Sequence, residues 1–370
     1  MYIKSLKLQN FRNYADESFA FDPAVNLICG ENGQGKTNLL EAAAACSTMR
    51  LFRTAQKKEG LRFGENHAFI FADFLAQERD ISLELRFSRT KAMEIYKNGV
   101  RQKRQSDAQG LLKTVLFCPE DLMLVRAGAA ARRRFLDTAL CQMRPNYARY
   151  LEEYNRLHEH KTRILRDSEE KPSLLSMWED FSLRMAHIGA QIIRYRAYYC
   201  RKLLKAAAAV YADIAPHEVL SGVYKTVSSV TDPFADARTI EKQLIDHVFS
   251  HKTAEIAAKS CLSGPHKDDL ELLLDGRSAA SFGSQGQVRT CILSLKLAER
   301  ELFFDEDGEY PVLLLDDVLS ELDRRRQDFV LNRISAGQVM ITCCEDGISE
   351  KLRAGAVFHI QNGEKSAETH

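Results

Sequence analysis

The sequence predicts an α/β protein whose parallel sheet and helices are interrupted by a long helical insertion. Two short apolar runs, at 25–29 and 312–315, have the composition of strands that are buried on both faces. Between them, from about 120 to 261, apolar residues recur at helical rather than strand spacing. At 370 residues the chain can hold one large domain or two ordinary ones.

The first apolar run leads directly into a loop with the G-x-x-x-x-G-K-T pattern of a P-loop. The loop reads Gly30-Glu31-Asn32-Gly33-Gln34-Gly35-Lys36-Thr37 and is followed by Asn38 and a helix-favouring stretch. Glycines let backbone N–H groups turn onto phosphate oxygens, and the helix N-terminus that follows favours an anion. We expect residues 30–38 to bind ATP, with Lys36 on the β- and γ-phosphates and Thr37 helping to hold Mg²⁺.

The spacing of apolar residues divides the chain into a part with strand patterns and a part with helical patterns. Residues 1–119 are rich in strand patterns, including the alternation at 81–87 and an Asn98-Gly99 hairpin signal. We expect a nucleotide-binding core over 1–119 and 262–370, and a helical lobe over 120–261. Within the lobe, helical runs at 147–166 and 174–214 flank a break at Pro172 and predict a short antiparallel helical hairpin.

The second apolar run ends in Asp316 and Asp317, the pattern of a Walker B strand. A carboxylate at the end of a strand beside a P-loop can hold Mg²⁺, so we assign that role to Asp316. Asp317 points elsewhere and is expected to orient the attacking water. Ser320 and Asp323 follow in an S-x-L-D order that is typical of the D-loop of ABC-type ATPases.

About thirty residues before the Walker B strand stands a second candidate anion site, which reads Ser284-Gln285-Gly286-Gln287 and opens a helix. One triphosphate has no obvious use for two such sites on one chain, whereas two chains can share them. We therefore expect Ser284 and its neighbours to complete the P-loop site of a second copy. The alternative is an ordinary N-capped helix.

Composition excludes several classes of protein. The formal net charge of +1 gives no global sign of nucleic-acid or membrane binding, so any such surface is a local patch. The nine cysteines are scattered without a C-x-x-C pair, and no apolar run reaches membrane-spanning length. The N-terminus opens into a strand pattern rather than a secretory signal. We expect a cytoplasmic protein that does not contact the membrane.

Several segments, in order and nearly along the whole chain, resemble the RecF family. They include Asn10-Phe11-Arg12-Asn13-Tyr14, the P-loop with Asn38, Phe117-Cys118-Pro119-Glu120-Asp121-Leu122, Arg132-Arg133-Arg134-Phe135-Leu136-Asp137, Gly264-Pro265-His266-Lys267-Asp268-Asp269-Leu270, the Ser284 signature and Asp316-Asp317. One departure is Gly128-Ala129-Ala130-Ala131, where the family usually has a proline before its arginines.

The resemblance implies an ABC-type P-loop ATPase head of the SMC class without the long coiled coil. It implies ATP-dependent homodimerisation as a clamp on DNA, including single-strand/double-strand gap junctions. It also implies weak, DNA-stimulated ATP hydrolysis, and partnership with RecO and RecR in loading recombinase during recombinational repair and replication restart. Cys343 stands where many ABC proteins carry a switch histidine, which agrees with slow hydrolysis because a neutral thiol is a poorer donor.

Two other classes share parts of this pattern. The nucleotide-binding subunit of a transporter normally shows an L-S-G-G-Q signature, a glutamate after Walker B and a switch histidine, all three of which differ here. A structural SMC-like tether needs a longer helical arm than this insertion provides.

Three basic clusters are candidates for phosphate contact. Arg50, Arg53, Lys57 and Lys58 follow the P-loop helix and are our preferred DNA-binding residues. Arg132–Arg134 and the basic residues at 194–205 have the alternative of intramolecular ion pairs or a solvated helix face. His266 is a candidate for metal binding or acid–base chemistry. We favour a structural role because no second histidine lies at ligand spacing.

Overall fold

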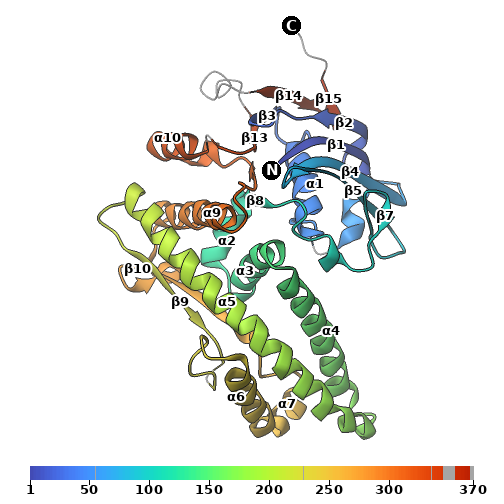
Figure 1. Ribbon diagram of the computed structural model, residues 1–370, viewed down its shortest axis with the longest axis vertical. Coiled ribbons are helices and arrows are strands. Elements are labelled where there is room, and N and C mark those ends of the chain that lie inside the picture. Colours follow the sequence, from blue (N-terminus) through green and yellow to red (C-terminus); the bar gives the residue numbers. More distant parts are fainter. Residues whose placement is uncertain (55, 228, 335, 345–354, 367–370) are drawn as a thin grey trace. The chain divides into compact units, whose positions relative to one another are not determined.

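The computed structural model describes residues 1–54, 56–227, 229–334, 336–344 and 355–366. They form two compact units, which we call unit 1 (Met1–Asp121 with Lys296–His370) and unit 2 (Leu122–Leu295). Figure 1 shows how the elements of each unit follow one another. The second boundary falls later than the residue 262 expected from the sequence, because the strand after that point pairs with a strand of unit 2.

Unit 1 contains an antiparallel sheet of six strands in the order β2-β1-β4-β5-β6-β7. Its strands are β1 (Tyr2–Phe11), β2 (Tyr14–Ala20), β4 (His67–Ala76), β5 (Arg79–Ser88), β6 (Glu94–Lys97) and β7 (Val100–Arg101). Asn98 and Gly99 join the last two strands with φ of 49° and 77°, as the predicted Asn-Gly hairpin requires.

The second sheet of unit 1 has the order β15-β14-β3-β13-β12-β8, and its strands pair in parallel except for β15. The strands are β3 (Val25–Cys29), β8 (Thr114–Phe117), β12 (Val312–Leu315), β13 (Val339–Cys343), β14 (Ala356–Gln361) and β15 (Glu364–Lys365). All four residues of β12 are buried, as expected of a central parallel strand. Both apolar runs predicted from the sequence are therefore strands of one sheet.

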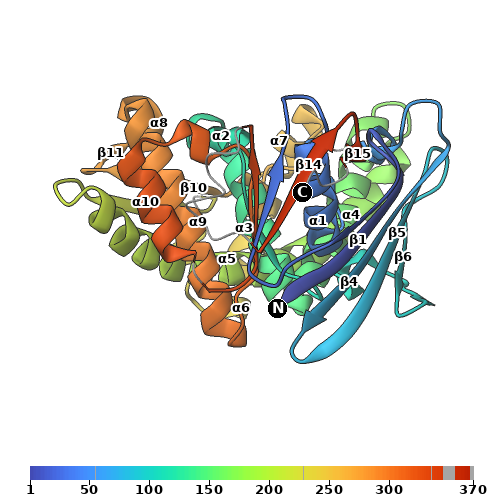
Figure 2. The same cartoon turned by 90° about the horizontal axis from the view of Figure 1, so that it is seen from above.

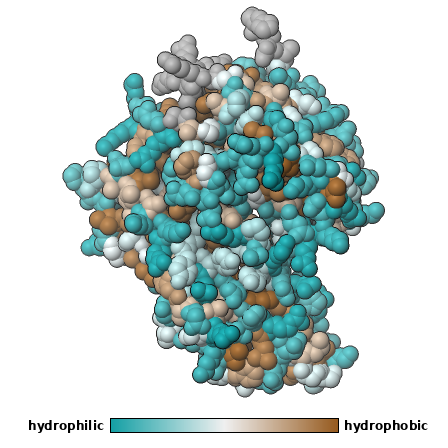
Figure 3. Space-filling model, viewed as in Figure 1, coloured by the Kyte–Doolittle hydropathy of each residue, from teal (hydrophilic) through white to brown (hydrophobic). Residues whose placement is uncertain are grey.

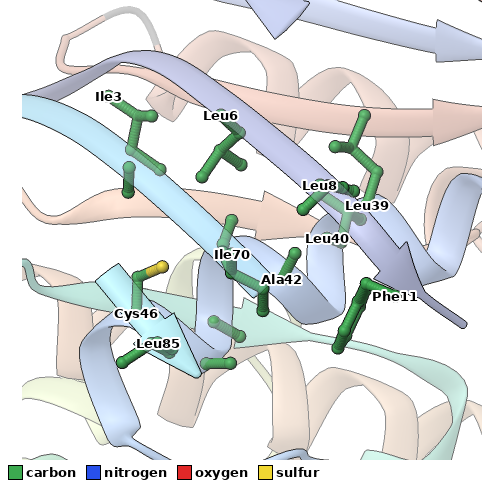
Figure 4. Close-up of a cluster of buried hydrophobic side chains, with 14 of the residues drawn as sticks. Ile3, Leu6, Leu8, Phe11, Leu39, Leu40, Ala42, Cys46, Ile70 and Leu85 are labelled. Atoms are coloured by element: carbon green, nitrogen blue, oxygen red, sulfur yellow. The ribbon is translucent and has the colours of Figure 1, made fainter. Parts of the chain in front are cut away.

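Helix α1 (Lys36–Thr48) lies between the two sheets of unit 1 (Figure 2). Buried residues of β1, β4 and β5 point onto this helix, and Figure 4 shows Leu8, Leu40 and Ile70 among them. The remaining helices of unit 1 are α10 (Arg324–Arg333), the C-terminal part of α9 (Gln285–Asp307) and the short turns η1 (Lys57–Gly60), η2 (Gln105–Asp107), η3 (Pro119–Asp121) and η6 (Leu319–Glu321). This apolar packing holds α1 against the sheet, and the P-loop that leads into the helix is positioned with it.

Unit 2 is built around two long helices, α4 (Pro145–Asp167) and α5 (Trp178–Ile214), which pack along each other and are joined through η4 (Pro172–Met177). The other helices are α2 (Leu122–Arg126), α3 (Ala129–Met143), α6 (Ala237–Ser250), α7 (Lys252–Ala258), η5 (Pro265–Lys267), α8 (Ala279–Phe282) and the start of α9. A small antiparallel sheet, β11-β10-β9, consists of β9 (Leu220–Lys225), β10 (Asp269–Leu274) and β11 (Arg277–Ser278). Unit 2 therefore combines helices with a sheet.

No helix in the described part of the chain is both long and apolar enough to cross a membrane. The face drawn in Figure 3 is mostly hydrophilic, with apolar residues scattered over it.

Candidate functional site

The P-loop turns sharply between β3 and α1 because three of its glycines have positive φ. Gly30, Gly33 and Gly35 have φ of 147°, 83° and 124°. A Cβ on Gly30 would lie 2.4 Å from the carbonyl oxygen of Ile360, so only glycine fits there. No side chain caps the N-terminus of α1, which leaves its first backbone N–H groups available to an anion.

Lys36, the first residue of α1, folds its side chain back over the loop. It is 5% exposed, and its Nζ donates to the carbonyl oxygens of Gly30 and Glu31 at 2.5 and 3.1 Å. These are neutral acceptors, so they hold the ammonium in place without neutralising it. The cation is therefore poised above the phosphate cradle.

Thr37 and Asp316 meet at the edge of the parallel sheet, as the P-loop and Walker B patterns predict. The Thr37 hydroxyl donates to Asp316 Oδ1 at 2.9 Å, and the Thr342 hydroxyl donates to the same oxygen at 3.0 Å. Burial raises the pKa of Asp316, and these two hydrogen bonds act in the opposite direction. The hydroxyl and carboxylate oxygens are hard donors of the kind that Mg²⁺ prefers, so the pair fits that ion.

Asp317 leaves the strand end in a left-handed backbone conformation with φ of 55°. Its backbone N–H donates to the Thr342 hydroxyl at 2.8 Å, and its side chain is partly exposed. Its Oδ1 lies 3.8 Å from the sulfur of Cys344, and burial, together with the charge of Asp317, raises the pKa of Asp316. A non-glycine residue held at positive φ is typical of functional loops.

The two D-loop residues have different local roles. The Ser320 hydroxyl donates to the carbonyl oxygen of Asp317 at 2.6 Å and ties this loop to the strand end. Asp323 caps α10 by accepting from the backbone N–H of Arg326 at 3.0 Å, and this hydrogen bond lowers the pKa of Asp323.

Cys344, rather than Cys343, reaches the P-loop. Cys343 is buried in β13 with its sulfur 2.9 Å from that of Cys29, the residue paired with it on β3. The exposed Cys344 has its sulfur 3.4 Å from Lys36 Nζ and 3.8 Å from Asp317 Oδ1. Cys343, the last residue of β13, is buried as part of that strand, so the thiol beside Lys36 is that of the next residue.

Sequence reasoning missed the side chains that hold the P-loop from outside. The Asn13 amide donates to the carbonyl oxygen of Gln34 at 2.8 Å, and its own oxygen accepts from Asn38 at 2.8 Å. From the β14–β15 turn, the backbone N–H of Gly363 donates to the same Gln34 carbonyl at 2.9 Å, and that of Asn362 donates to Gln34 Oε1 at 2.6 Å. Asn13 belongs to the N-terminal motif 10–14 that resembles the RecF family, so its importance could have been predicted from the sequence. The β14–β15 turn lies in no such motif.

The signature residues lie in unit 2, at the N-terminus of α9. The Ser284 hydroxyl accepts from the backbone N–H of Gln287 at 3.2 Å, and Gln287 Oε1 accepts from the backbone N–H of Ser284 at 2.8 Å. These reciprocal hydrogen bonds form a capping box, so Ser284 does cap the helix, as the alternative interpretation of the sequence expects. Ser284 and Gln285 are nevertheless exposed, and Gly286 is partly exposed. Exposed N–H groups at this helix end can still bind an anion from another molecule.

The preferred DNA-binding residues lie in the segment that follows α1. Arg50, Arg53 and Lys58 are exposed, and the side chain of Lys57 lies outside the described residues. Arg53 Nη1 donates to Asn38 Oδ1 at 2.9 Å, so this basic segment is connected to the helix that begins at the P-loop.

The other basic cluster near the start of unit 2 is used internally. Arg132 makes a two-pronged contact with Asp269 at 2.6 and 2.9 Å, and Arg133 Nη1 donates to the carbonyl oxygen of Asp268 at 2.6 Å. Intramolecular pairing, the alternative considered from the sequence, therefore accounts for both side chains.

Arg196, from the basic run on α5, is buried at the centre of unit 2. Its guanidinium donates to Asp137 Oδ1 at 2.9 Å, to Asp268 Oδ2 at 3.2 Å and to the carbonyl oxygen of Pro265 at 2.7 Å. Burial raises the pKa of Asp268 to about 7, against the opposing effect of Arg196. This arginine is a structural ion-pair partner rather than a surface cation.

His266 lies beside that network and has hydrogen-bond partners at both ring nitrogens. Nδ1 is 2.8 Å from the Tyr154 hydroxyl, and Nε2 is 3.0 Å from the carbonyl oxygen of Cys261. Burial, with His158 as a further cause, lowers the pKa of His266 to about 3. This arrangement is that of a structural histidine.

Comparison with known proteins gives the same assignment throughout the chain. The family model described as the RecF/RecN/SMC N terminal domain matches residues 2–366. The DNA replication and repair protein RecF of Acetivibrio thermocellus is 33% identical over 361 residues, which cover 98% of each chain. That of Lactobacillus johnsonii is 37% identical over 368 residues, again with 98% of each chain covered.

Solved structures agree. A structure of the recombination mediator protein RecF with ATP in the RecFOR pathway has a TM-score of 0.92 at 31% identity and covers 99% of this chain and 98% of that chain. An SMC head domain from Pyrococcus furiosus, at 15% identity and a TM-score of 0.55, shares the fold and covers 99% of this chain and 95% of that chain. The predicted ABC-type, SMC-like head is therefore confirmed, and the chain belongs to the RecF/RecN/SMC family and, within it, to the RecF proteins of DNA replication and repair.

Proposed function

We propose that this protein is an ATP-dependent DNA-binding protein of recombinational repair and replication restart, and a slow, DNA-stimulated ATPase of the cytoplasm. The observation that carries the proposal is the half-site formed by Lys36, Thr37 and Asp316, whose cation and hard oxygens suit a Mg²⁺–triphosphate. The ATP in a solved RecF structure supports the choice of nucleotide. Residues 30–38 bind ATP, and Thr37 and Asp316 bind Mg²⁺, the latter through water.

The second half of the site comes from another copy of the chain. Ser284, Gln285, Gly286 and Gln287 of one subunit contact the nucleotide held by the other, and Ser320 and Asp323 lie at the same interface. Asp317 orients the hydrolytic water, and hydrolysis opens the dimer. The exposure of Ser284 at a helix N-terminus supports this assignment. A ligand bound by both subunits stabilises the closed dimer by its differential affinity for that state.

The closed dimer encloses DNA, including single-strand/double-strand gap junctions. Arg50, Arg53, Lys57 and Lys58 contact phosphates, and the Arg53–Asn38 hydrogen bond links that contact to the nucleotide half-site. RecO and RecR act with the protein in loading recombinase. The RecFOR pathway named for the solved RecF structures supports this partnership.

The test is the oligomeric state of purified variants, followed by light scattering with and without ATP. Lys36→Ala abolishes ATP binding and the dimer together, because it removes the phosphate cation. Ser284→Arg retains ATP binding and remains monomeric, since the large cation blocks the helix end. Asp317→Asn binds ATP and accumulates as a dimer, because hydrolysis stalls. Ser173→Arg, at another exposed serine of unit 2, is the matched control and dimerises normally.

Normal ATP-dependent dimers of Ser284→Arg contradict the shared site. Unchanged turnover of ATP in Asp317→Asn removes that residue from the catalytic role. If the ATPase responds to a membrane partner and not to DNA, the function is that of a transporter subunit.

A further inference from the structure

Phe63, in the loop between η1 and β4, stands in solvent on a turn closed by backbone hydrogen bonds. Its relative exposure of 103% is the highest among the large apolar residues of the described chain. Fully exposing a phenylalanine forgoes the burial that usually accounts for its presence. The whole face of the ring is therefore available for contact with another molecule.

The loop that carries Phe63 is fixed on both sides. Before it, the backbone N–H of Arg62 donates to the carbonyl oxygen of Asn10 at 2.8 Å, next to the bridge between Phe11 and Leu61. After it, Arg89 donates from its side chain to the carbonyl oxygen of Glu65 at 3.0 Å.

The turn itself is closed by a hydrogen bond from the backbone N–H of Glu65 to the carbonyl oxygen of Arg62, at 3.0 Å. Gly64 has a φ of 87°, which the turn requires next to Phe63. The backbone that carries the ring is thus held in one conformation, so little backbone freedom is lost on binding.

The positive charge near Phe63 indicates what kind of molecule the ring contacts. Residues 50–66 carry five basic and two acidic side chains, a net +3, whereas the whole chain has a net charge of +1. Arg62 and Lys58 are exposed in the same stretch as the ring. Phosphates complement such cations, and an unstacked nucleobase complements an exposed aromatic face.

We propose that Phe63 stacks on an unpaired base where double-stranded DNA passes into single-stranded DNA, while the neighbouring cations bind the flanking phosphates. The inference rests on the proposed DNA-binding function and adds to it the residue that contacts the unpaired base. The interior of a duplex offers no free base face, so Phe63 discriminates in favour of the junction over an uninterrupted duplex. Phosphate contacts cannot do this, because both kinds of DNA carry them.

The experiment is a fluorescence-anisotropy titration of the full chain with ATP, on a gapped duplex and on an ungapped duplex of equal length with the same blunt ends. Phe63→Ala binds the junction about tenfold more weakly, the effect of losing one stacked base, and binds the duplex as before. Phe63→Tyr retains junction binding because it keeps the aromatic face. Val219→Ala, at another exposed apolar residue, is the matched control and changes neither affinity.

Two further readouts separate stacking from charge. Arg62→Ala weakens both DNAs alike and lowers the slope of log Kd against log salt by about one, whereas Phe63→Ala leaves that slope unchanged. A 2-aminopurine placed at the first unpaired position changes fluorescence on binding the wild type and not on binding Phe63→Ala.

Equal affinities of Phe63→Ala and the wild type for the junction overturn the inference, as does an equal loss on both DNAs. A Phe63→Ala protein that binds both DNAs normally but loses its ATP-dependent dimer assigns the ring to a protein contact instead. If the wild type binds neither DNA, the proposed function itself fails.

Discussion

Unit 1 and unit 2 differ in how completely they bury the two partners of an ion pair. The core of unit 1 joins buried aliphatic and aromatic residues of two sheets and α1, including Leu8, Leu40 and Ile70 (Figure 4). Unit 2 also has an apolar cluster, and among its helices it buries both partners of an ion pair. Lys161 and Glu255 are 1% and 0% exposed with 2.6 Å between Nζ and Oε2, and Arg196 lies deep in a second polar network.

This difference indicates which interactions the stability of each unit depends on. Apolar packing acts without direction and is lost in proportion to the volume removed. A buried ion pair gains little net stability over an apolar core, but removing one partner leaves an uncompensated charge in a medium of low polarity. Unit 2 therefore depends on complete pairs at its centre, whereas unit 1, in which Arg12 stays 16% exposed beside the buried Glu41, depends more on apolar packing.

The largest expected effect breaks one such pair. Glu255→Ala leaves Lys161 buried without a counter-charge and should lower the free energy of unfolding by about 4 kcal/mol. Trp178, the single tryptophan of the chain, donates to Glu255 Oε2 at 3.1 Å, so its fluorescence during denaturant unfolding reports on this region.

Two controls sharpen this prediction. Glu159→Ala removes an exposed partner of Arg163 in the same unit and should change stability by less than about 0.5 kcal/mol. Replacing both Lys161 and Glu255 by methionine should be far milder than Glu255→Ala. A double variant as unstable as the single one would show that packing, rather than charge, holds this region.

A truncation in unit 1 should have a somewhat smaller effect. Leu8→Ala opens a cavity at a fully buried position of β1 and should lower stability by about 3 kcal/mol. Hydrogen exchange followed by mass spectrometry should show faster exchange in the peptides of β1, β2 and β4, and unchanged exchange in those of α4 and α5. Val100→Ala, at an exposed position of β7, is the control. Equal acceleration in both units would mean that they unfold as one.

The smallest of the three effects depends on pH. The pKa of His266 falls from about 6.5 in the unfolded chain to about 3 in the folded one, mainly through burial. Neutral His266 therefore contributes stability above pH 6.5, and this contribution is lost as the pH falls toward 3. Between pH 7 and pH 5 the loss is about 2 kcal/mol.

The measurement compares the wild type with His266→Gln at each pH. The difference between their free energies of unfolding should move by about 2 kcal/mol between pH 7 and pH 5, in favour of the variant at pH 5. Taking the difference removes the opposite pH dependence of Asp268, whose raised pKa stabilises the fold as pH falls. A difference that does not change with pH would mean that His266 titrates normally.

Much of the nucleotide half-site was predictable because its signals are local. The glycines of the P-loop, the buried run at 312–315 and the two aspartates after it each define a short structure by their own sequence, and all three lie where they were expected. The contacts from Thr342, Cys344 and the Asn362–Gly363 turn were not predictable. They come from strands whose order in the sheet is set by pairing between distant parts of the chain.

The sequence by itself therefore determined the family, the P-loop and the Walker B strand, because each depends on residues within a few positions of one another. Only the tertiary structure decided that Arg196 is buried, that Cys344 rather than Cys343 approaches Lys36, and that Phe63 stands fully in solvent. The physical reason is that burial and partner choice depend on the packing of distant segments, which no local pattern encodes.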